Sequence, residues 1–397
     1  MTENLENPFT QKELPVLITL DVCDGSFDQG ERKPRFRDLM ETLPGMRDLI
    51  GEVISARKVK GLPVTWFIRA DMQVKENTGN AMGLFLGWRD FWDGVRASGS
   101  ECAWHPHLYK RHGHKWTTIR EPGRLKAEAD KIRHEMSGEE WKPTTCRIGE
   151  SVGSNELMGF LDSIGILADS SALPGRKRDD GLRWFDWSGT PTDPYRPARG
   201  DYRRPSRARG AGDRAEGEES LSILEIPFTM AGIRAPYDKV EASGTVRRYM
   251  DLSFAPELLE KAVSRIVHNV DYLMLVVHPL QAVGREVPGG GLVVGGMDIL
   301  RRNLLGVLNS VTAANRTLRL MTLDRFARAW LRMETGEEAG KTAETAGGEK
   351  RETRYARAKG GTQRTTVEKE KAVRSTTKSE IRAVSRPPRR GPRKRRG

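Results

Sequence analysis

Short apolar runs alternate with longer amphipathic stretches along the chain, from about residue 15 to residue 333. The apolar runs are brief, and several are rich in Val, Ile or Leu, which is typical of buried parallel strands. They predict about eight strands, which are Val16–Leu20, Val64–Ile68, Glu101–Trp104, Thr145–Ile148, Ile166–Asp169, Ile223–Phe228, Tyr272–Val277 and Leu318–Thr322.

The stretches between these runs have the apolar spacing of helices. Alternating strands and helices imply βα units and a parallel sheet. About eight strands in roughly 320 residues favour a (β/α)7–8 barrel; an open doubly wound sheet is the alternative, although no nucleotide-binding glycine motif supports it. The predicted helices are Gly45–Lys60, Gly83–Ser98, Pro122–Met136, Ser154–Ile164, Ala255–His268 and Met297–Ser310.

Two polar segments interrupt the pattern. The charged and glycine-containing stretch Arg199–Glu219 indicates a long surface loop, which we place at about residues 171–221. Residues 334–397 contain almost no large apolar side chains, so we expect them to be disordered, because they cannot bury enough surface to offset the entropy of ordering. The predicted organisation is a flexible N-terminus at 1–13, one barrel domain at 14–333 and a disordered tail at 334–397.

Most of the net positive charge of the chain lies in that tail. The chain of 397 residues has a net charge of +13, of which residues 334–397 carry +10, with 19 Lys and Arg against 9 Asp and Glu. The tail can therefore bind an anionic partner such as nucleic acid or anionic lipid. A solvated tail without a specific partner is the favoured interpretation, because a run of charge by itself specifies nothing. The remaining +3 says little about what the barrel binds.

The sequence also bears on location. Three cysteines exclude a disulfide framework and fit a reducing compartment. The first residues lack the basic and apolar regions of a secretory signal, and no apolar run approaches the ~18 residues of a membrane span. We therefore expect a cytoplasmic protein without a transmembrane segment.

Polar side chains follow most of the predicted strands. In barrels the chemistry takes place at the carboxyl ends of the strands, so these residues are the candidates for function. Three of the seven histidines lie at such ends. The candidates are Asp21 and Asp24 after the first strand, Arg69 and Asp71 after the second, His105 and His107 after the third, Arg147 after the fourth and His278 after the seventh.

Carboxylates and histidines in this arrangement can hold a divalent metal ion. One aspartate with His105 and His107 supplies three ligands and leaves a position for water, which is the pattern of catalytic sites. The second aspartate can then take a proton from that water, with Arg147 keeping it ionised. His278 can protonate the leaving group or bind the oxyanion.

Each of these residues also has a simpler interpretation. An aspartate after a strand can cap the next segment, and the two histidines can form a solvated turn. Cys23 is interpreted as a buried structural thiol rather than as a metal ligand. Trp187 and Tyr195, on the long loop, can stack on a sugar ring or simply anchor the loop.

The same motifs resemble those of the polysaccharide deacetylase superfamily, also called the NodB-homology family or carbohydrate esterase family four. The resemblance runs from roughly Leu14 to Arg332. Residues 17–25 (LITLDVCDG) resemble the family's T-F-D-D-G strand, and residues 101–107 (ECAWHPH) resemble its E-I-G-x-H motif. Residues 63–69 (PVTWFIR), Arg147, residues 165–171 (GILADSS), residues 275–279 (LVVHP) and residues 321–324 (MTLD) resemble its remaining motifs.

The resemblance implies a barrel that uses zinc or a similar divalent ion to remove N- or O-linked acetyl groups from sugars. It implies Asp21 as the base, Asp24, His105 and His107 as metal ligands, and His278 and Arg147 as catalytic residues. Asp21 as the metal ligand in place of Asp24 is the open alternative. The chain departs from the family in two spacings. Two residues separate Asp21 from Asp24, where the family has adjacent aspartates. The histidines lie two residues apart instead of four, as in divergent members, and an extended segment still points both to one side.

The resulting hypothesis is a metal-dependent hydrolase of the cytoplasm that deacetylates a saccharide. The expected substrate is a nucleotide- or lipid-linked polysaccharide precursor, with a small amide as the other possibility for a cytoplasmic member. Substrate binding is assigned to Arg69, Asp71, Trp187 and Tyr195. The alternative is a catalytically silent saccharide-binding or scaffold barrel, with the basic tail binding an anionic partner.

Overall fold

The computed structural model describes residues 9–10, 12–23, 36–113, 115–138, 140–181, 183–206, 219–238, 246–284 and 291–334. They belong to the larger of two units in the chain, Met1–Thr342, whereas the second unit, Ala343–Gly397, lies outside the described residues. The predictions for the tail, for Asp24 and for most of residues 1–13 therefore fall outside the described part of the chain.

A ten-stranded sheet forms the centre of the larger unit. Its order is β12-β7-β6-β3-β2-β1-β15-β14-β13, with β16 also paired to β1, and all pairings except β13 with β14 are parallel. The strands are β1 (Glu13–Val22), β2 (Val64–Ile68), β3 (Glu101–Trp104), β6 (Thr145–Cys146), β7 (Ala168–Asp169), β12 (Leu224–Glu225), β13 (Met230–Gly232), β14 (Arg247–Asp251), β15 (Leu273–Val277) and β16 (Thr317–Leu320).

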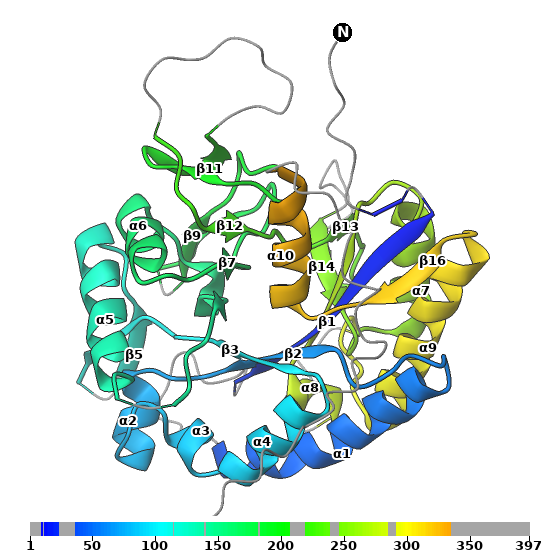
Figure 1. The fold of residues 1–397 in the computed structure, drawn as a ribbon, viewed down its shortest axis with the longest axis horizontal. Coiled ribbons are helices and arrows are strands. Elements are labelled where there is room, and N and C mark those ends of the chain that lie inside the picture. Colours follow the sequence, from blue (N-terminus) through cyan, green and yellow to red (C-terminus); the bar gives the residue numbers. More distant parts are fainter. Residues whose placement is uncertain are drawn as a thin grey trace, which may run out of the picture. The chain divides into compact units, whose positions relative to one another are not determined.

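Most of the described helices lie around the outside of this curled sheet, and the last of them lies across one end of it (Figure 1). Their apolar faces pack into one continuous core with the strands. They are α1 (Phe36–Ser55), α2 (Met72–Thr78), α3 (Gly83–Leu86), α4 (Arg89–Ala97), α5 (Pro122–Glu135), α6 (Asn155–Ser163), α7 (Pro256–Ile266), α8 (Pro279–Ala282), α9 (Met297–Ala313) and α10 (Leu323–Glu334), with a short 3-10 turn, η1 (Gly149–Ser151), after β6.

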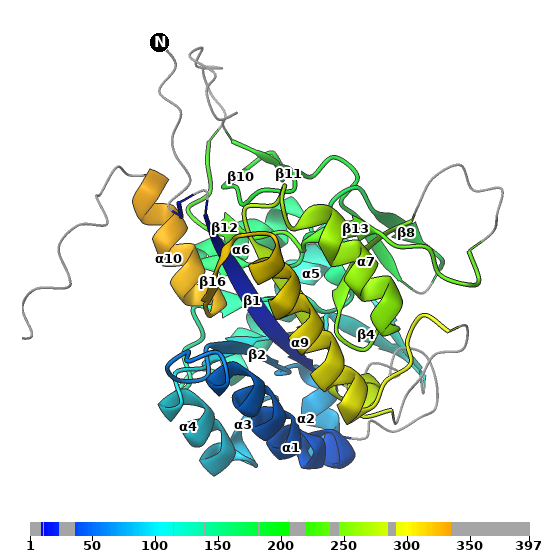
Figure 2. The ribbon, with the colours of Figure 1, turned by 90° about the vertical axis from the view of Figure 1, so that its right-hand side faces the viewer.

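Strand β1 lies at the centre of the sheet because nine of its ten residues are buried and most of them are apolar. It pairs with β15 along one edge, over Val16–Leu20. Two strands pair with the other edge of β1: β16 with its residues Glu13–Val16, and β2 with its residues Ile18–Val22. Figure 2 shows β1 running diagonally through the unit, with β16 and β2 beside it.

In the described part of the chain, the sheet does not close into a barrel. Strands β12 and β13 are the two ends of the order, and no pairing among the described residues joins β12 to β13 or to β15. The gap is spanned by a side chain: the Thr229 hydroxyl donates to the Tyr272 carbonyl (3.3 Å) and accepts from the Met274 amide (2.9 Å). The predicted parallel α/β fold is therefore confirmed in its class, and the expected closure is replaced by an open, curled sheet.

Helix α10 covers the amino ends of three central strands. The Leu323 amide donates to the Thr65 hydroxyl at 2.8 Å, and the Asp324 amide donates to the Glu101 carboxylate at 3.0 Å. The Asp324 carboxylate in turn accepts from the Thr144 hydroxyl, just before β6, at 2.9 Å. Because this helix occupies the amino ends, the carboxyl ends are left for a functional site.

All eight predicted strands are present in the sheet, several with shorter bounds. Strands β13 and β14 were not predicted, and neither were α2, α8 and α10. The predicted helix Gly83–Ser98 is two helices, and α1 begins earlier, at Phe36. The predicted loop at 171–221 holds strand pairs, which are β8 (Lys177–Asp179) with β9 (Trp184–Asp186) and β10 (Pro197–Ala198) with β11 (Asp201–Pro205), and a further pair, β4 (Tyr109–His112) with β5 (Lys115–Thr118), follows β3.

Across the helices that the structure describes, none has the length and apolar character needed to span a membrane. The three cysteines, Cys23, Cys102 and Cys146, are free and buried.

Candidate active site

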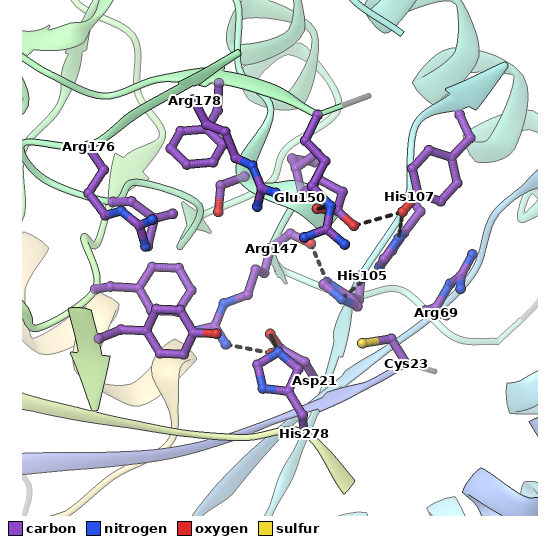
Figure 3. A pocket seen from close by; sticks show the side chains of 18 of the residues that line it. Asp21, Cys23, Arg69, His105, His107, Arg147, Glu150, Arg176, Arg178 and His278 are labelled. Carbon is purple, nitrogen blue, oxygen red and sulfur yellow. Dashed lines mark hydrogen bonds and ion pairs between the residues drawn. The ribbon is translucent and has the colours of Figure 1, made fainter. Parts of the chain in front are cut away.

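A cavity of about 230 Å³ opens at the carboxyl ends of the central parallel strands. Figure 3 shows the side chains converging on it from different strands. Parallel strands bring their carboxyl ends to one edge, so residues far apart in the sequence meet there. The lining includes Asp21 and Cys23 from the end of β1, His105 and His107 after β3, Arg147 after β6 and His278 after β15.

Asp21 lies between two cationic groups. Its Oδ1 accepts from Arg147 Nη1 at 2.6 Å, and its Oδ2 lies 3.7 Å from Nε2 of His278. Burial alone would raise the pKa of this carboxyl, but the charge and hydrogen bond of Arg147, with the charge of His278, lower it below its usual value. Asp21 is therefore an ionised carboxylate that faces the cavity.

Arg147 is fixed on every side. Its guanidinium lies between the rings of Phe67 and Phe228, 4.1 and 4.4 Å from their centroids. It also donates to the Thr19 hydroxyl and to the Ser170 carbonyl, each at 3.0 Å. These contacts fix the position and orientation of the guanidinium, and its hydrogen bond to Oδ1 therefore fixes the position of the Asp21 carboxylate.

His278 is paired on its other nitrogen with a second aspartate. Its Nδ1 lies 3.0 Å from Oδ2 of Asp251, at the end of β14. The other oxygen of Asp251 accepts from the Ser253 amide (2.8 Å) and the Ser253 hydroxyl (2.6 Å). Burial lowers the pKa of His278, but the hydrogen bond and charge of Asp251, with the charge of Asp21, outweigh it and raise the pKa. His278 can thus hold a proton at Nε2, facing the cavity.

The Nε2 atoms of His105 and His107 face each other, and neither carries a proton. Nδ1 of His105 lies 2.7 Å from the Arg147 carbonyl, which can only accept, so Nδ1 carries the proton. Nδ1 of His107 lies 2.9 Å from the Tyr109 hydroxyl, and that hydroxyl donates to Glu150 at 2.9 Å. The Tyr109 oxygen therefore accepts from Nδ1–H of His107, and neither Nε2 has a proton.

These two Nε2 atoms are 3.2 Å apart. Two lone pairs at this distance repel each other unless a cation lies between them, and Zn–N bonds of ~2.0–2.1 Å from one ion would span such a gap. Burial keeps both rings neutral: it lowers the pKa of His105 to about 4 and that of His107 well below its usual value. Neutral imidazoles are the form that binds metals.

Cys23 completes a three-ligand group. Its Sγ and the ligand nitrogens of His105 and His107 all lie within 4.8 Å of one another. One sulfur and two imidazole nitrogens form a donor set that suits Zn²⁺. The residues therefore fit the divalent metal that the resemblance implies, with Cys23 as a candidate ligand beside the two histidines. Asp24, the predicted carboxylate ligand, lies outside the described residues.

Two further residues shape the site around His107. A Cβ on Gly149 would overlap the His107 imidazole, 2.6 Å from its Nε2, so only glycine allows this close approach. The next residue, Glu150, has a φ of 58°, in the left-handed region that non-glycine residues rarely adopt. This backbone conformation accompanies the contact of its carboxylate with Tyr109.

Five predicted site residues are brought together in the cavity: Asp21, His105, His107, Arg147 and His278. Arg69 also lines it, with its Nε 2.8 Å from Oδ2 of Asp71. Asp71 lies behind the lining. It caps α2 by accepting from the Gln73 and Val74 amides and accepts from the His107 amide at 3.2 Å, so it positions the histidine segment.

Trp187 and Tyr195 are not brought to the cavity. Trp187 is fully buried, and its Nε1 donates to the Ser151 carbonyl at 2.8 Å. Tyr195 donates its hydroxyl to the Tyr202 carbonyl at 2.9 Å. Both contacts match the simpler interpretation, in which these rings anchor the loop.

Sequence reasoning missed four residues of the site. Cys23 was interpreted as structural, although it lies between the two candidate aspartates. Tyr109 occupies the place four residues after His105 where the family has a histidine, and it serves that region as a hydrogen-bond partner. Asp251 was missed with its strand, and Glu150 carries no local signal because its role depends on the turn after β6.

No protein-family model and no curated protein matches the chain. Among solved structures, it is similar to a "putative polysaccharide deacetylase" from Mycobacterium smegmatis (14% identity, TM-score 0.46, 82% of this chain and 92% of that chain). It is also similar to a 4-alpha-glucanotransferase from Thermococcus litoralis (10%, 0.38, 79% and 38%). A third is a "putative polysaccharide deacetylase involved in O-antigen biosynthesis" from Bordetella bronchiseptica (13%, 0.30, 76% and 90%).

Two of these descriptions name the class that the sequence motifs resemble. Fold and site together define an α/β protein with a carboxylate–histidine pair beside a candidate metal centre.

Proposed function

We propose that this protein is a metal-dependent hydrolase that removes an N- or O-linked acetyl group from a saccharide. The observation that carries the proposal is the position of Asp21 and His278. An ionised carboxylate and a histidine with a raised pKa lie 3.7 Å apart on the wall of the cavity that also holds His105 and His107. Paired groups whose environments push their pKa values apart are typical of acid–base catalysis.

Asp21 is the proposed base. It takes a proton from the water that adds to the acetyl carbonyl carbon. A divalent ion bound by Cys23, His105 and His107 would supply polarisation of the carbonyl and a lowered pKa of the water. Arg147 keeps Asp21 ionised and aligned, since its bond to Oδ1 leaves Oδ2 free to accept. This engagement with Arg147 favours Asp21 as base over Asp21 as metal ligand.

His278 is the proposed acid. Its Nε2 proton passes to the nitrogen or oxygen that leaves the acyl carbon as the C–N or C–O bond breaks. The products are acetate and the free amine or hydroxyl of the saccharide. Asp251 holds the ring so that Nε2 faces the cavity, and it stabilises the protonated form before the transfer.

The alternative of a silent barrel is not favoured. Asp251 raises the pKa of His278, and Arg147 lowers the pKa of Asp21. Saccharide binding without catalysis does not require these two opposite pKa shifts in neighbouring groups. The cavity lining also includes the aromatic residues Phe185, Phe228 and Tyr249, a type of side chain on which sugar rings stack. A cytoplasmic location stays a prediction.

The test measures acetate release and metal content together. We expect the purified protein to contain about one zinc per chain and to release acetate from N- or O-acetylated saccharides, with activity lost on chelation and restored by zinc. Asp21→Asn should keep the metal and lose activity by about 10²–10⁴-fold. His105→Ala should lose the metal, whereas His134→Ala, at an exposed position of α5, should change neither.

Absence of acetate release from all acetylated saccharides, in protein shown to hold its metal, would overturn the proposal. Equal activity of Asp21→Asn and wild type would also overturn the assigned mechanism.

A further inference from the structure

One wall of the cavity is built from arginines. Arg176, Arg178 and Arg183 come from the segment around the β8–β9 pair and line the cavity that Asp21 and His278 share. Figure 3 shows Arg176 and Arg178 across the pocket from His105 and His107. The proposed hydrolysis uses none of the three, so they require a separate explanation.

The carboxylates of the lining do not balance this charge. Among the described residues, the cavity is lined by two carboxylates, Asp21 and Glu150, against five arginines. Asp21 is bound to Arg147, and Glu150 forms an ion pair with Arg183, with 3.1 Å between Oε2 and Nε. Arg178 lies 2.6 Å from Asp180, on its own hairpin.

Arg176 stands apart from these pairs. Within the described part of the chain, its guanidinium forms no ion pair and no side-chain hydrogen bond; it lies over the ring of Phe185, with 5.9 Å from Cζ to the centroid. Contact with a ring face leaves the N–H groups of a guanidinium free to donate. Burial lowers its pKa, and Arg248 and Arg178 add to this effect, so positive charge crowds the group.

The backbone at Arg176 is held in place. The Arg176 carbonyl accepts from the Trp187 amide at 2.8 Å, and the Gly175 amide donates to the Trp187 carbonyl at 3.0 Å. Trp187 is fully buried, and it anchors the open end of the β8–β9 pair, where Arg176 lies. The wall is therefore built in advance of any ligand, and binding would need little ordering of the chain.

We propose that Arg176, together with Arg178, forms a subsite for an anionic group, a phosphate or a carboxylate, carried by the saccharide that reacts at Asp21 and His278. Guanidinium groups bind such oxyanions through paired N–H donors, and partial burial strengthens the interaction. This inference rests on the proposed function for the position of the saccharide. It adds the substrate class: an acidic or phosphorylated saccharide in place of a neutral one.

Binding is tested with deacetylated saccharides, which cannot turn over. Calorimetry would compare glucosamine with glucosamine 1-phosphate and with 2-amino-2-deoxyglucuronic acid, on the wild type and on Arg176→Gln. We expect at least one anionic sugar to bind the wild type about tenfold or more tightly than glucosamine, as one charged hydrogen bond supplies. The anionic sugar that binds more tightly identifies the source of the oxyanion.

Arg176→Gln should reduce that preference to about twofold or less. Arg176→Lys keeps the positive charge but lacks the planar N–H donors of a guanidinium. It should therefore retain part of the preference for the anionic sugar. Arg302→Gln, an exposed arginine of α9 paired with Glu257, is the matched control and should keep the full preference. A thermal melt of each variant checks that it is folded.

Equal binding of neutral and anionic sugars by the wild type, or a preference that survives in folded Arg176→Gln, would overturn the inference. The outcome is separable from that of the proposed function. Acetate release without an anionic preference rejects the subsite alone, whereas an Arg176-dependent preference without acetate release rejects the hydrolase and leaves the anion site.

Discussion

The Nε2 atoms of His105 and His107 face each other at 3.2 Å, each left without a proton by the partner of its own Nδ1. The Arg147 carbonyl holds one Nδ1–H, and the Tyr109 hydroxyl holds the other. Two buried, neutral imidazoles arranged in this way are ready to share one cation. The pair therefore connects the acid–base half of the cavity, through the backbone of Arg147, to the candidate metal centre.

Cys23 is expected to be the third metal ligand. Cys23→Ser should lower zinc affinity by about tenfold or more, because a hydroxyl is a much weaker ligand than a thiolate. Cys23→Asp should retain zinc, since a carboxylate oxygen is an accepted ligand. Competition with a fluorescent zinc chelator measures both affinities. Cys102→Ser, at a buried thiol on β3, is the control, and an unchanged affinity in Cys23→Ser would show that the sulfur is not a ligand.

Tyr109 is expected to control the tautomer of His107. Tyr109→Phe removes the acceptor of Nδ1–H and breaks the contact with Glu150, so the proton can move to Nε2. Loss of such an outer partner typically costs about 10–100-fold in metal affinity. Tyr237→Phe, at an exposed tyrosine, is the matched control. Metal affinity equal to that of the wild type would contradict the assigned tautomer.

Asp251 is expected to set the alkaline limit of activity. The pKa of His278 is raised because Asp251 and Asp21 favour its protonated form, against burial and the charge of Arg147. An acid is active below its pKa, so activity should fall as the pH rises through that raised value. Asp251→Asn removes one negative charge, lowers the pKa of His278 and should move the alkaline limb of the kcat profile to lower pH.

The control for this profile is Asp298→Asn, at an exposed position of α9. If the alkaline limb of the kcat profile lies at the same pH in Asp251→Asn as in the wild type, His278 does not supply the proton.

Gly149 is expected to be intolerant of a side chain. In Gly149→Ala the new methyl group would overlap the His107 ring, so the imidazole must move and the metal should bind at least about tenfold more weakly. Gly159→Ala, inside α6 where a Cβ meets only the end of Arg199 at 4.0 Å, should keep full affinity and gain about 0.5–1 kcal/mol of stability. Wild-type metal content in Gly149→Ala would show that the ring tolerates displacement.

Local pattern predicted the central strands well because each is a short, nearly continuous apolar run with a polar residue at its end. β2 and β3 have the predicted bounds, and β1 extends the predicted run in both directions. Strand β14 was missed because its sequence, RRYMD, has charged ends and gains its apolar environment only from its neighbours in the fold, β13, β15 and α7. Its end residue, Asp251, was missed for the same reason.

The sequence by itself determined the parallel α/β class and placed Asp21, His105, His107, Arg147 and His278 at strand ends, because these depend on runs of a few residues. Only the tertiary structure decided which atoms meet. It left the sheet open between β12 and β13, placed the Cys23 sulfur beside the histidines, and kept Trp187 away from the cavity. These outcomes depend on register, side-chain direction and burial between segments far apart in the chain, which no local pattern records.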